Sequence, residues 1–166
     1  MYILLFFLLK PDVGININSV PMLDVRRDFS SSIVGTRSFS NNPSVVTKIG
    51  NFCVREFHKH KIATIMKHIP GHGLSKQDTH LKEAVVNNKK NELINKDFKP
   101  FKESKSFFAM TSHIIYSKYD PIFAATHSKI IINEVIRKHI GFKGILISDD
   151  ISMKALKYSY ISNAKK

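Results

Sequence analysis

The sequence predicts an α/β fold built on a parallel sheet, and two features of the chain lead to this prediction. Short apolar runs alternate with segments whose apolar residues recur at helical spacing. Each short run also ends in polar side chains, as happens where the carboxyl ends of parallel strands collect a site. The chain has 166 residues, of which 43% are hydrophobic, which is enough for one domain with a buried core. The pattern fits either an open sheet or part of an eight-stranded barrel, since about four strands cannot close a (β/α)8 barrel.

The first half of the chain contains two predicted strands and one predicted helix. Residues 14–23, GININSVPML, read as a buried strand that ends in charged residues. Pro43 suits a first helical turn, and apolar residues at helical spacing extend that helix to about Lys59. Residues 62–66 form the second apolar run. The polar residues 74–88 that follow predict a mobile loop.

The second half repeats the alternation. A helical segment at about residues 92–102 precedes a third strand at residues 107–110. Ser128 is typical of a helix N-cap and Gly141 of a helix C-terminus, so a further helix lies between them. Residues 144–147 form the fourth predicted strand, which runs directly into a serine and two aspartates.

The composition bears on the partners of the protein. A formal net charge of +13 would favour contact with nucleic acid or acidic membrane. The lysines are scattered, however, and the sequence has neither an arginine-rich block nor an aromatic and basic RNA motif. Nucleic-acid binding is therefore kept only as an alternative. The single cysteine, Cys53, excludes a disulfide framework, which favours the reducing cytoplasm and predicts that Cys53 packs in the core.

The two ends of the chain differ in character. The first nine residues, MYILLFFLL, are apolar but too short to span a bilayer, which takes about 20 residues. They also lack the basic segment and cleavage site of a signal peptide. Two interpretations fit this segment. It is either a buried element or hydrophobic surface that is exposed because upstream chain is missing. We expect a single partial domain over residues 1–166, with a polar tail at residues 157–166.

The motif KHIPGHG, residues 67–73, places basic side chains on a turn. Lys67 and His68 are expected to end the second strand and to point hydrogen-bond donors into a pocket, which suits a ligand rich in hydroxyl groups. The proline and glycines turn the backbone and rule out a continuous helix on which the two histidines would bind zinc. The alternative is a metal site made of four histidines, His68, His72, His80 and His113.

Two further motifs carry carboxylates. In QDTH, Asp78 can orient the His80 ring and raise its basicity, which suits a general acid and base, although such a pair is also typical of solvated surface. In ISDDISM, residues 147–153, an aspartate at a strand end can act as a nucleophile toward a sugar, as a metal ligand or as a helix N-cap. With two adjacent aspartates, one can cap while the other reacts.

Taken in order, these motifs resemble the family 3 glycoside hydrolases, specifically the bacterial β-N-acetylhexosaminidases that recycle cell-wall fragments. The resemblance covers about residues 12–156 and is carried by five segments: GININSVPMLDV, RSFSNNP, KHIPGHGLSKQDTH, MTSHIIYSKYDP and IGFKGILISDDISM. It implies a partial (β/α)8 TIM barrel with about four parallel strands and intervening helices. It also implies a carbohydrate substrate containing N-acetylglucosamine, such as a muropeptide, with neither nucleic acid nor membrane as a partner.

The resemblance also implies roles for single residues. Asp149 matches the nucleophile of a retaining reaction, and His80, oriented by Asp78, matches the general acid and base. Residues that match the sugar-binding and pocket-lining positions are Arg37, Lys67, His68 and His113. Matching residues that we expect to be structural are Asp150, Ser152 and Met153. The implied reaction requires no metal or cofactor.

The chain departs from the family pattern at both ends. It begins at what resembles the third barrel strand, without a DQEGG-like segment, and it stops soon after the nucleophile motif. Open sheet edges would favour self-association or a complementary chain. Three hypotheses follow: an active hexosaminidase domain, an inactive remnant of one, and a basic nucleic-acid-binding protein.

Overall fold

The computed structural model describes residues 14–31, 34–156, 162 and 164–165. The expectations for residues 1–9, and for most of the tail at 157–166, fall outside this part of the chain. The strands are β1 (Ile17–Asn18), β2 (Ala63–Ile69), β3 (Ala84–Val86), β4 (Phe108–Thr111), β5 (Ile114–Tyr116) and β6 (Ile145–Ser148). The helices are η1 (Gly35–Arg37), α2 (Pro43–Lys59), α3 (Lys90–Glu92), η2 (Leu93–Asp97), α4 (Lys99–Lys102) and η3 (Ile131–His139).

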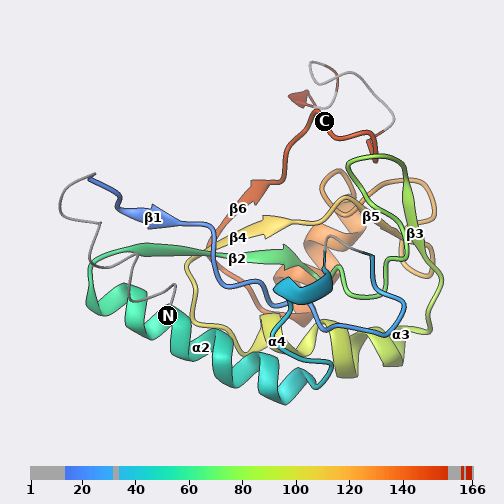
Figure 1. Ribbon diagram of the computed structural model, residues 1–166. Coiled ribbons are helices and arrows are strands. Elements are labelled where there is room, and N and C mark those ends of the chain that lie inside the picture. The colour runs from blue at the N-terminus through green and yellow to red at the C-terminus, as the bar shows by residue number, and fades with distance from the viewer. Residues whose placement is uncertain (1–13, 32–33, 157–161, 163, 166) are drawn as a thin grey trace.

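The main sheet has four strands in the order β1-β2-β4-β6, and all of its pairs are parallel. Each strand lies beside the next main strand along the chain, with a helical segment between them (Figure 1). This is the order of consecutive strands in a (β/α)8 barrel. The prediction of a parallel α/β arrangement is confirmed. A second, two-stranded parallel sheet pairs β3 with β5.

Helix α2 begins and ends where the sequence predicts. Asn42 caps it, because its side-chain oxygen accepts hydrogen bonds from the backbone N–H groups of Ser44 and Val45, and Pro43 occupies the first turn. Cys53 lies on the buried face of the helix. The prediction that Cys53 packs in the core is therefore confirmed, and burial raises the pKa of its thiol.

The first strand is much shorter than predicted. Of residues 14–23, only Ile17–Asn18 form β1, and the chain returns to the sheet through an isolated bridge between Met22 and Lys67. Pro21 has no N–H to continue the ladder, which explains the interruption. In contrast, β2 includes Lys67 and His68, as expected, and ends one residue later at Ile69.

Two other segments also differ from the prediction. Residues 74–88, predicted to be a loop, contain β3, and its partner β5 was not predicted, because three-residue strands are too short to show periodicity. The helical segment predicted at 92–102 is present but divided into α3, η2 and α4, with Pro100 inside α4. The cap at Ser128 is confirmed, since its Oγ accepts a hydrogen bond from the Ile131 N–H at 3.0 Å.

Helices cover one face of the sheet (Figure 1). On that face, Met66 of β2 and Ala109 of β4 belong to a hydrophobic core that includes Val46 of α2, Phe101 of α4 and Ile136 of η3. These side chains are buried. Burial of this kind stabilises the fold by about 25 cal/mol for each Å² of apolar surface removed from water.

The opposite face, which we call the open face, is only partly buried. The register places Ile65, Phe108 and Ile145 in one row across β2, β4 and β6. Ile65 and Phe108 are half-buried, and Ile145 is 49% exposed. In a closed barrel this row would point into the interior.

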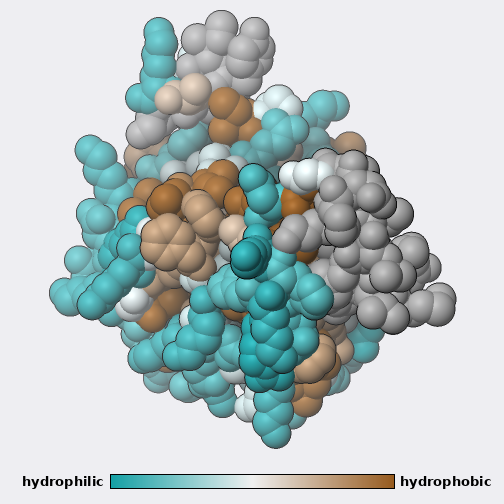
Figure 2. Space-filling view, turned by 90° about the vertical axis from the view of Figure 1, so that its left-hand side faces the viewer, coloured by the Kyte–Doolittle hydropathy of each residue, from teal (hydrophilic) through white to brown (hydrophobic). Residues whose placement is uncertain are grey.

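The face at the amino ends of the strands shows a group of hydrophobic residues bordered by hydrophilic ones (Figure 2). The exposed apolar side chains at or next to these strand starts are Ile17, Phe107 and Ile145. Within the described residues, no helix is both long and apolar enough to cross a bilayer.

Candidate active site

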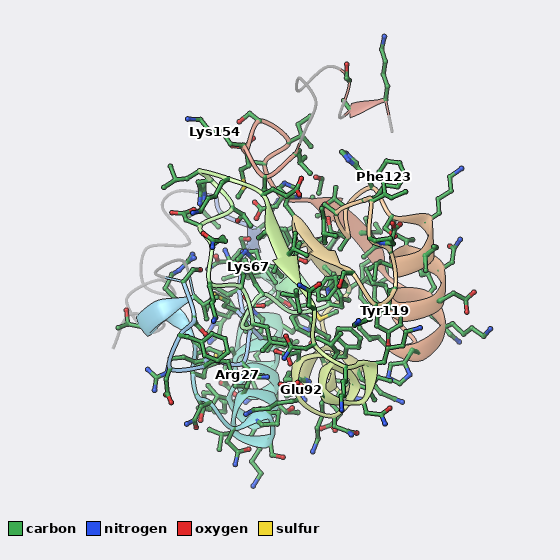
Figure 3. The ribbon with its side chains drawn as sticks, turned by 90° about the vertical axis from the view of Figure 1, so that its right-hand side faces the viewer. Arg27, Lys67, Glu92, Tyr119, Phe123 and Lys154 are labelled. Atoms are coloured by element: carbon green, nitrogen blue, oxygen red, sulfur yellow. The ribbon has the colours of Figure 1, made fainter. Side chains whose placement is uncertain are left out.

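The candidate site lies at the carboxyl ends of the main strands, on the side of the molecule that faces the viewer in Figure 3. Lys67 and His68 are near the end of β2, and Asp149 follows directly after β6. Parallel strands bring these ends to one edge of the sheet, so residues more than 80 positions apart in the sequence meet there.

A buried carboxylate holds the turn KHIPGHG in place. Asp24 is fully buried, and its Oδ2 accepts a 2.7 Å hydrogen bond from His68 Nδ1. Its Oδ1 accepts hydrogen bonds from the backbone N–H groups of His68 at 3.3 Å and His72 at 2.6 Å. Burial by itself would raise the pKa of Asp24, but attraction to His68 and these hydrogen bonds hold that pKa below its usual value. Asp24 is therefore a fixed anion.

The contact with Asp24 directs the other nitrogen of His68 toward Asp149. His68 Nε2 lies 3.8 Å from Asp149 Oδ2. Lys67 lies in the same electrostatic environment, because burial and the nearby Arg37 guanidinium lower its pKa while Asp149 and Asp24 oppose that change. The structure thus brings together Arg37, Lys67, His68 and Asp149.

A cavity of about 470 Å³ adjoins this group. Lys67 and Arg37 line it together with Asn18 and Ser19, and Lys67 Nζ donates a 3.3 Å hydrogen bond to Ser19 Oγ. The remaining lining is apolar: Val20, Pro21, Met22, Phe39, Cys53 and Phe57. A pocket with a few polar donors and apolar walls is typical of a site for a small molecule.

Asp78 and His80 form the predicted pair. Asp78 Oδ1 accepts hydrogen bonds from His80 Nδ1 at 2.9 Å and from the His80 backbone N–H at 2.8 Å. Burial alone would raise the pKa of Asp78, but these hydrogen bonds and the imidazole together outweigh it and lower that pKa. The pair is exposed to solvent, with 60% of the His80 side chain accessible. In the part of the chain that the structure describes, no ion pair joins His80 to Asp149.

His113 is buried, and protein groups contact both of its ring nitrogens. Its Nε2 donates to the Asp150 carbonyl oxygen at 3.0 Å, and its Nδ1 accepts from the Thr126 hydroxyl at 2.7 Å. Burial lowers the pKa of this imidazole, which favours the neutral ring. In this position His113 fixes the backbone beside Asp149, and its predicted contact with the sugar stays a prediction.

Sequence analysis missed the role of Asp24. Its position could have indicated this role, because Asp24 directly follows the first predicted strand, as Asp149 follows the last. A lone aspartate at a strand end, however, is usually a helix cap. The four-histidine metal site considered above finds no support: among the residues that the structure describes, no group of three or more His, Cys, Asp or Glu side chains could hold a metal ion.

His72 provides a testable pH dependence. Burial lowers the pKa of its imidazole to about 4, against an opposing attraction to Asp24. Between about pH 6.5 and pH 4 the unfolded chain therefore takes up a proton that the folded protein does not, and the folded state loses stability as the pH falls. The gap between 6.5 and about 4 corresponds to roughly 3 kcal/mol.

The effect of His72 must be separated from that of Asp97. Burial raises the pKa of Asp97 to about 7 despite Arg27 at 2.7 Å, so this carboxyl favours the folded state as the pH falls over the same range. We therefore compare the free energy of unfolding of the protein with that of His72→Gln at pH 7.5 and pH 4. Between pH 7.5 and pH 4, the free energy of unfolding of the variant should rise relative to that of the parent by roughly 3 kcal/mol. The exposed His60→Gln variant should show no such change.

Comparison with known proteins identifies relatives across nearly the whole chain. Residues 10–165 match the family model described as the glycosyl hydrolase family 3 N terminal domain. A β-hexosaminidase of Hydrogenovibrio crunogenus is 36% identical over 147 residues, which are 86% of this chain and 40% of that protein. The chain thus spans less than half the length of this curated relative.

Solved structures agree with the sequence relatives. A glycoside hydrolase family 3 β-N-acetylglucosaminidase from Paenibacillus sp. matches with a TM-score of 0.84 and 29% identity, covering 88% of this chain and 28% of that one. NagZ from Neisseria gonorrhoeae in complex with N-trifluoroacetyl-D-glucosamine matches with a TM-score of 0.81 and 29% identity, covering 92% and 45%. The resemblance seen in the motifs and the partial barrel are both confirmed.

Proposed function

Because the chain belongs to glycosyl hydrolase family 3, we propose that it is a retaining β-N-acetylhexosaminidase. Its substrate is a terminal, β-linked N-acetylglucosamine on a cell-wall fragment such as a muropeptide. The observation that carries the proposal is the meeting of His68 Nε2 and Asp149 Oδ2 at 3.8 Å, beside the cationic groups of Lys67 and Arg37. A carboxylate next to hydrogen-bond donors of this kind supports the proposal, because such donors suit the hydroxyl groups of a sugar.

The proposed reaction has two steps. In the first, an Asp149 carboxylate oxygen forms a bond to the anomeric carbon, the glycosidic bond breaks, and His80 gives its proton to the departing oxygen. In the second, His80 takes a proton from water, the water oxygen bonds to the anomeric carbon, and Asp149 is released. Asp78, which accepts the His80 Nδ1–H at 2.9 Å, orients the ring so that Nε2 carries out both transfers.

Sugar binding is assigned to the residues around Asp149. Lys67 and Arg37 donate hydrogen bonds to ring hydroxyl groups, and both line the cavity of about 470 Å³. Asp24 holds His68 so that its Nε2 faces the sugar. The neighbour NagZ was solved with an N-acylated glucosamine, which supports a sugar of this class as the ligand. The single cysteine supports a cytoplasmic location.

The test is hydrolysis of 4-nitrophenyl N-acetyl-β-D-glucosaminide by the purified chain, once circular dichroism shows that it is folded. The matched control substrate is 4-nitrophenyl β-D-glucoside, which has the same leaving group but lacks the N-acetyl group. Preferential release of nitrophenol from the N-acetylated substrate supports the proposal. A folded chain that cleaves neither substrate would instead be an inactive remnant, and equal cleavage of both would contradict the proposed specificity.

A further inference from the structure

We propose that His72 is a positioning residue, which holds the loop bearing Asp78 and His80 through a hydrogen bond to Thr79. The inference rests on the proposed function, in which His80 is the general acid and base. It assigns a catalytic purpose to a buried histidine that has no part of its own in the proposed reaction.

Thr79 is the fixed point of the loop. It lies between Asp78 and His80 in the sequence, and it is only 2% exposed although His80 is exposed. Its hydroxyl lies 3.2 Å from His72 Nε2, and its carbonyl oxygen accepts a 3.0 Å hydrogen bond from the Ala155 N–H. The loop is therefore attached to the protein at the one residue that separates the two members of the catalytic pair.

His72 is itself held firmly. Its backbone N–H donates to Asp24 Oδ1 at 2.6 Å, and its carbonyl oxygen accepts from the Ser75 N–H at 3.1 Å. Its ring packs edge-on against the His68 ring, with 5.5 Å between centroids. Asp24 thus holds the His68 ring through Oδ2 and the His72 backbone through Oδ1.

The unpaired nitrogen of His72 indicates which atom donates. His72 Nδ1 is buried without a hydrogen-bond partner in the part of the chain that the structure describes. A buried N–H without a partner is rarer in proteins than a buried acceptor without one. The proton therefore resides on Nε2, which donates to the Thr79 hydroxyl. Burial lowers the pKa of this ring to about 4, so the donor is neutral and present throughout the neutral range.

Accurate placement matters most for the proton donor. A general acid must come within hydrogen-bond reach of the leaving oxygen, and a displacement of about 1 Å can cost on the order of 100-fold in rate. A leaving group that departs readily without a proton depends little on this placement. A leaving group that requires protonation depends on it fully.

The experiment compares kcat/KM for two substrates that share the sugar and differ in the leaving group. 4-Nitrophenyl N-acetyl-β-D-glucosaminide releases a stable phenolate, whereas N,N′-diacetylchitobiose releases a sugar that needs the proton. The test variant is Thr79→Val, which removes the hydroxyl at similar size, and the matched control is Thr79→Ser, which keeps it. His72→Phe, which keeps a ring of similar size without a donor, and the double variant complete a mutant cycle.

We expect Thr79→Val and His72→Phe each to lower kcat/KM for diacetylchitobiose by roughly 10- to 100-fold, and for the aryl substrate by less than about threefold. Thr79→Ser should retain the activity of the parent. The double variant should lose no more than either single variant, because one hydrogen bond is removed in all three.

Other outcomes would overturn the inference in distinguishable ways. Equal losses for both substrates would mean that Thr79 and His72 only support the fold, and the proposed function would stand. Additive losses in the double variant would mean that the two residues act separately. If the parent protein cleaves neither substrate, the proposed function fails, and the inference fails with it.

Discussion

Replacing Asp149 by asparagine should lower kcat/KM for an aryl N-acetyl-β-glucosaminide by about 10⁴-fold or more, because removal of a catalytic nucleophile has effects of this size. The amide has nearly the same shape as the carboxylate but cannot form the glycosyl-enzyme. The contact between Asp149 Oδ2 and His68 Nε2, at 3.8 Å, leaves room for the substitution without a clash. The measurement is the rate of nitrophenol release, with the unfolding midpoint of the variant as a check on folding.

The adjacent aspartate supplies the matched control. Asp150 Oδ1 accepts hydrogen bonds from the Ser152 N–H at 2.8 Å and from its hydroxyl at 2.7 Å, so this carboxylate closes a turn. Asparagine keeps an acceptor oxygen there, and Asp150→Asn should retain activity within about tenfold, as expected for a change confined to a turn. If Asp150→Asn abolished turnover and Asp149→Asn did not, the nucleophile would be Asp150.

Replacing Phe98 by alanine should lower the free energy of unfolding by about 3–5 kcal/mol, as for other large aromatic side chains removed from a core. Phe98 is fully buried, and its ring packs 6.0 Å from Tyr116 and 6.1 Å from Tyr119, measured between centroids. A small domain is stable by only about 5–15 kcal/mol, so the loss is a large part of the total. Urea unfolding followed by circular dichroism measures it.

The control is the same substitution at an exposed site. Phe107 is 58% exposed, so Phe107→Ala should cost less than about 1 kcal/mol. Similar losses at the two positions would contradict the assignment of the core to the helix-covered face. They would indicate that the apolar surface around Phe107 is buried against another molecule.

The sequence predicted most of the elements that place the site. Helix α2 is recognisable because the proline and the helical spacing of its apolar residues agree. The strands β2, β4 and β6 are short apolar runs followed by polar residues. This pattern locates the strands and places Asp149 at the carboxyl end of the last one. In contrast, β3 and β5 have only three residues each, which is too few to show a period.

The parts of the site that could not be predicted depend on contacts distant in sequence. Asp24 is 44 residues from His68, and nothing in the local sequence shows that its carboxylate turns toward that ring. The pairing of His72 with Thr79 spans only seven residues, yet it needs the turn at Gly73 to bring the two side chains together. Local patterns therefore identified the groups that we propose to react and missed the groups that hold them.

The open face also shapes how the folded state responds to denaturants and temperature. Ile65, Phe108 and Ile145 remain partly in contact with water in the folded state. Unfolding therefore exposes less new apolar surface for each residue than it would in a sheet covered on both faces. Both the urea dependence of the unfolding free energy and the heat-capacity change scale with that newly exposed surface. Per residue, this chain should therefore show a weaker urea dependence of its unfolding free energy than a closed barrel. Its unfolding free energy should also show less curvature as a function of temperature.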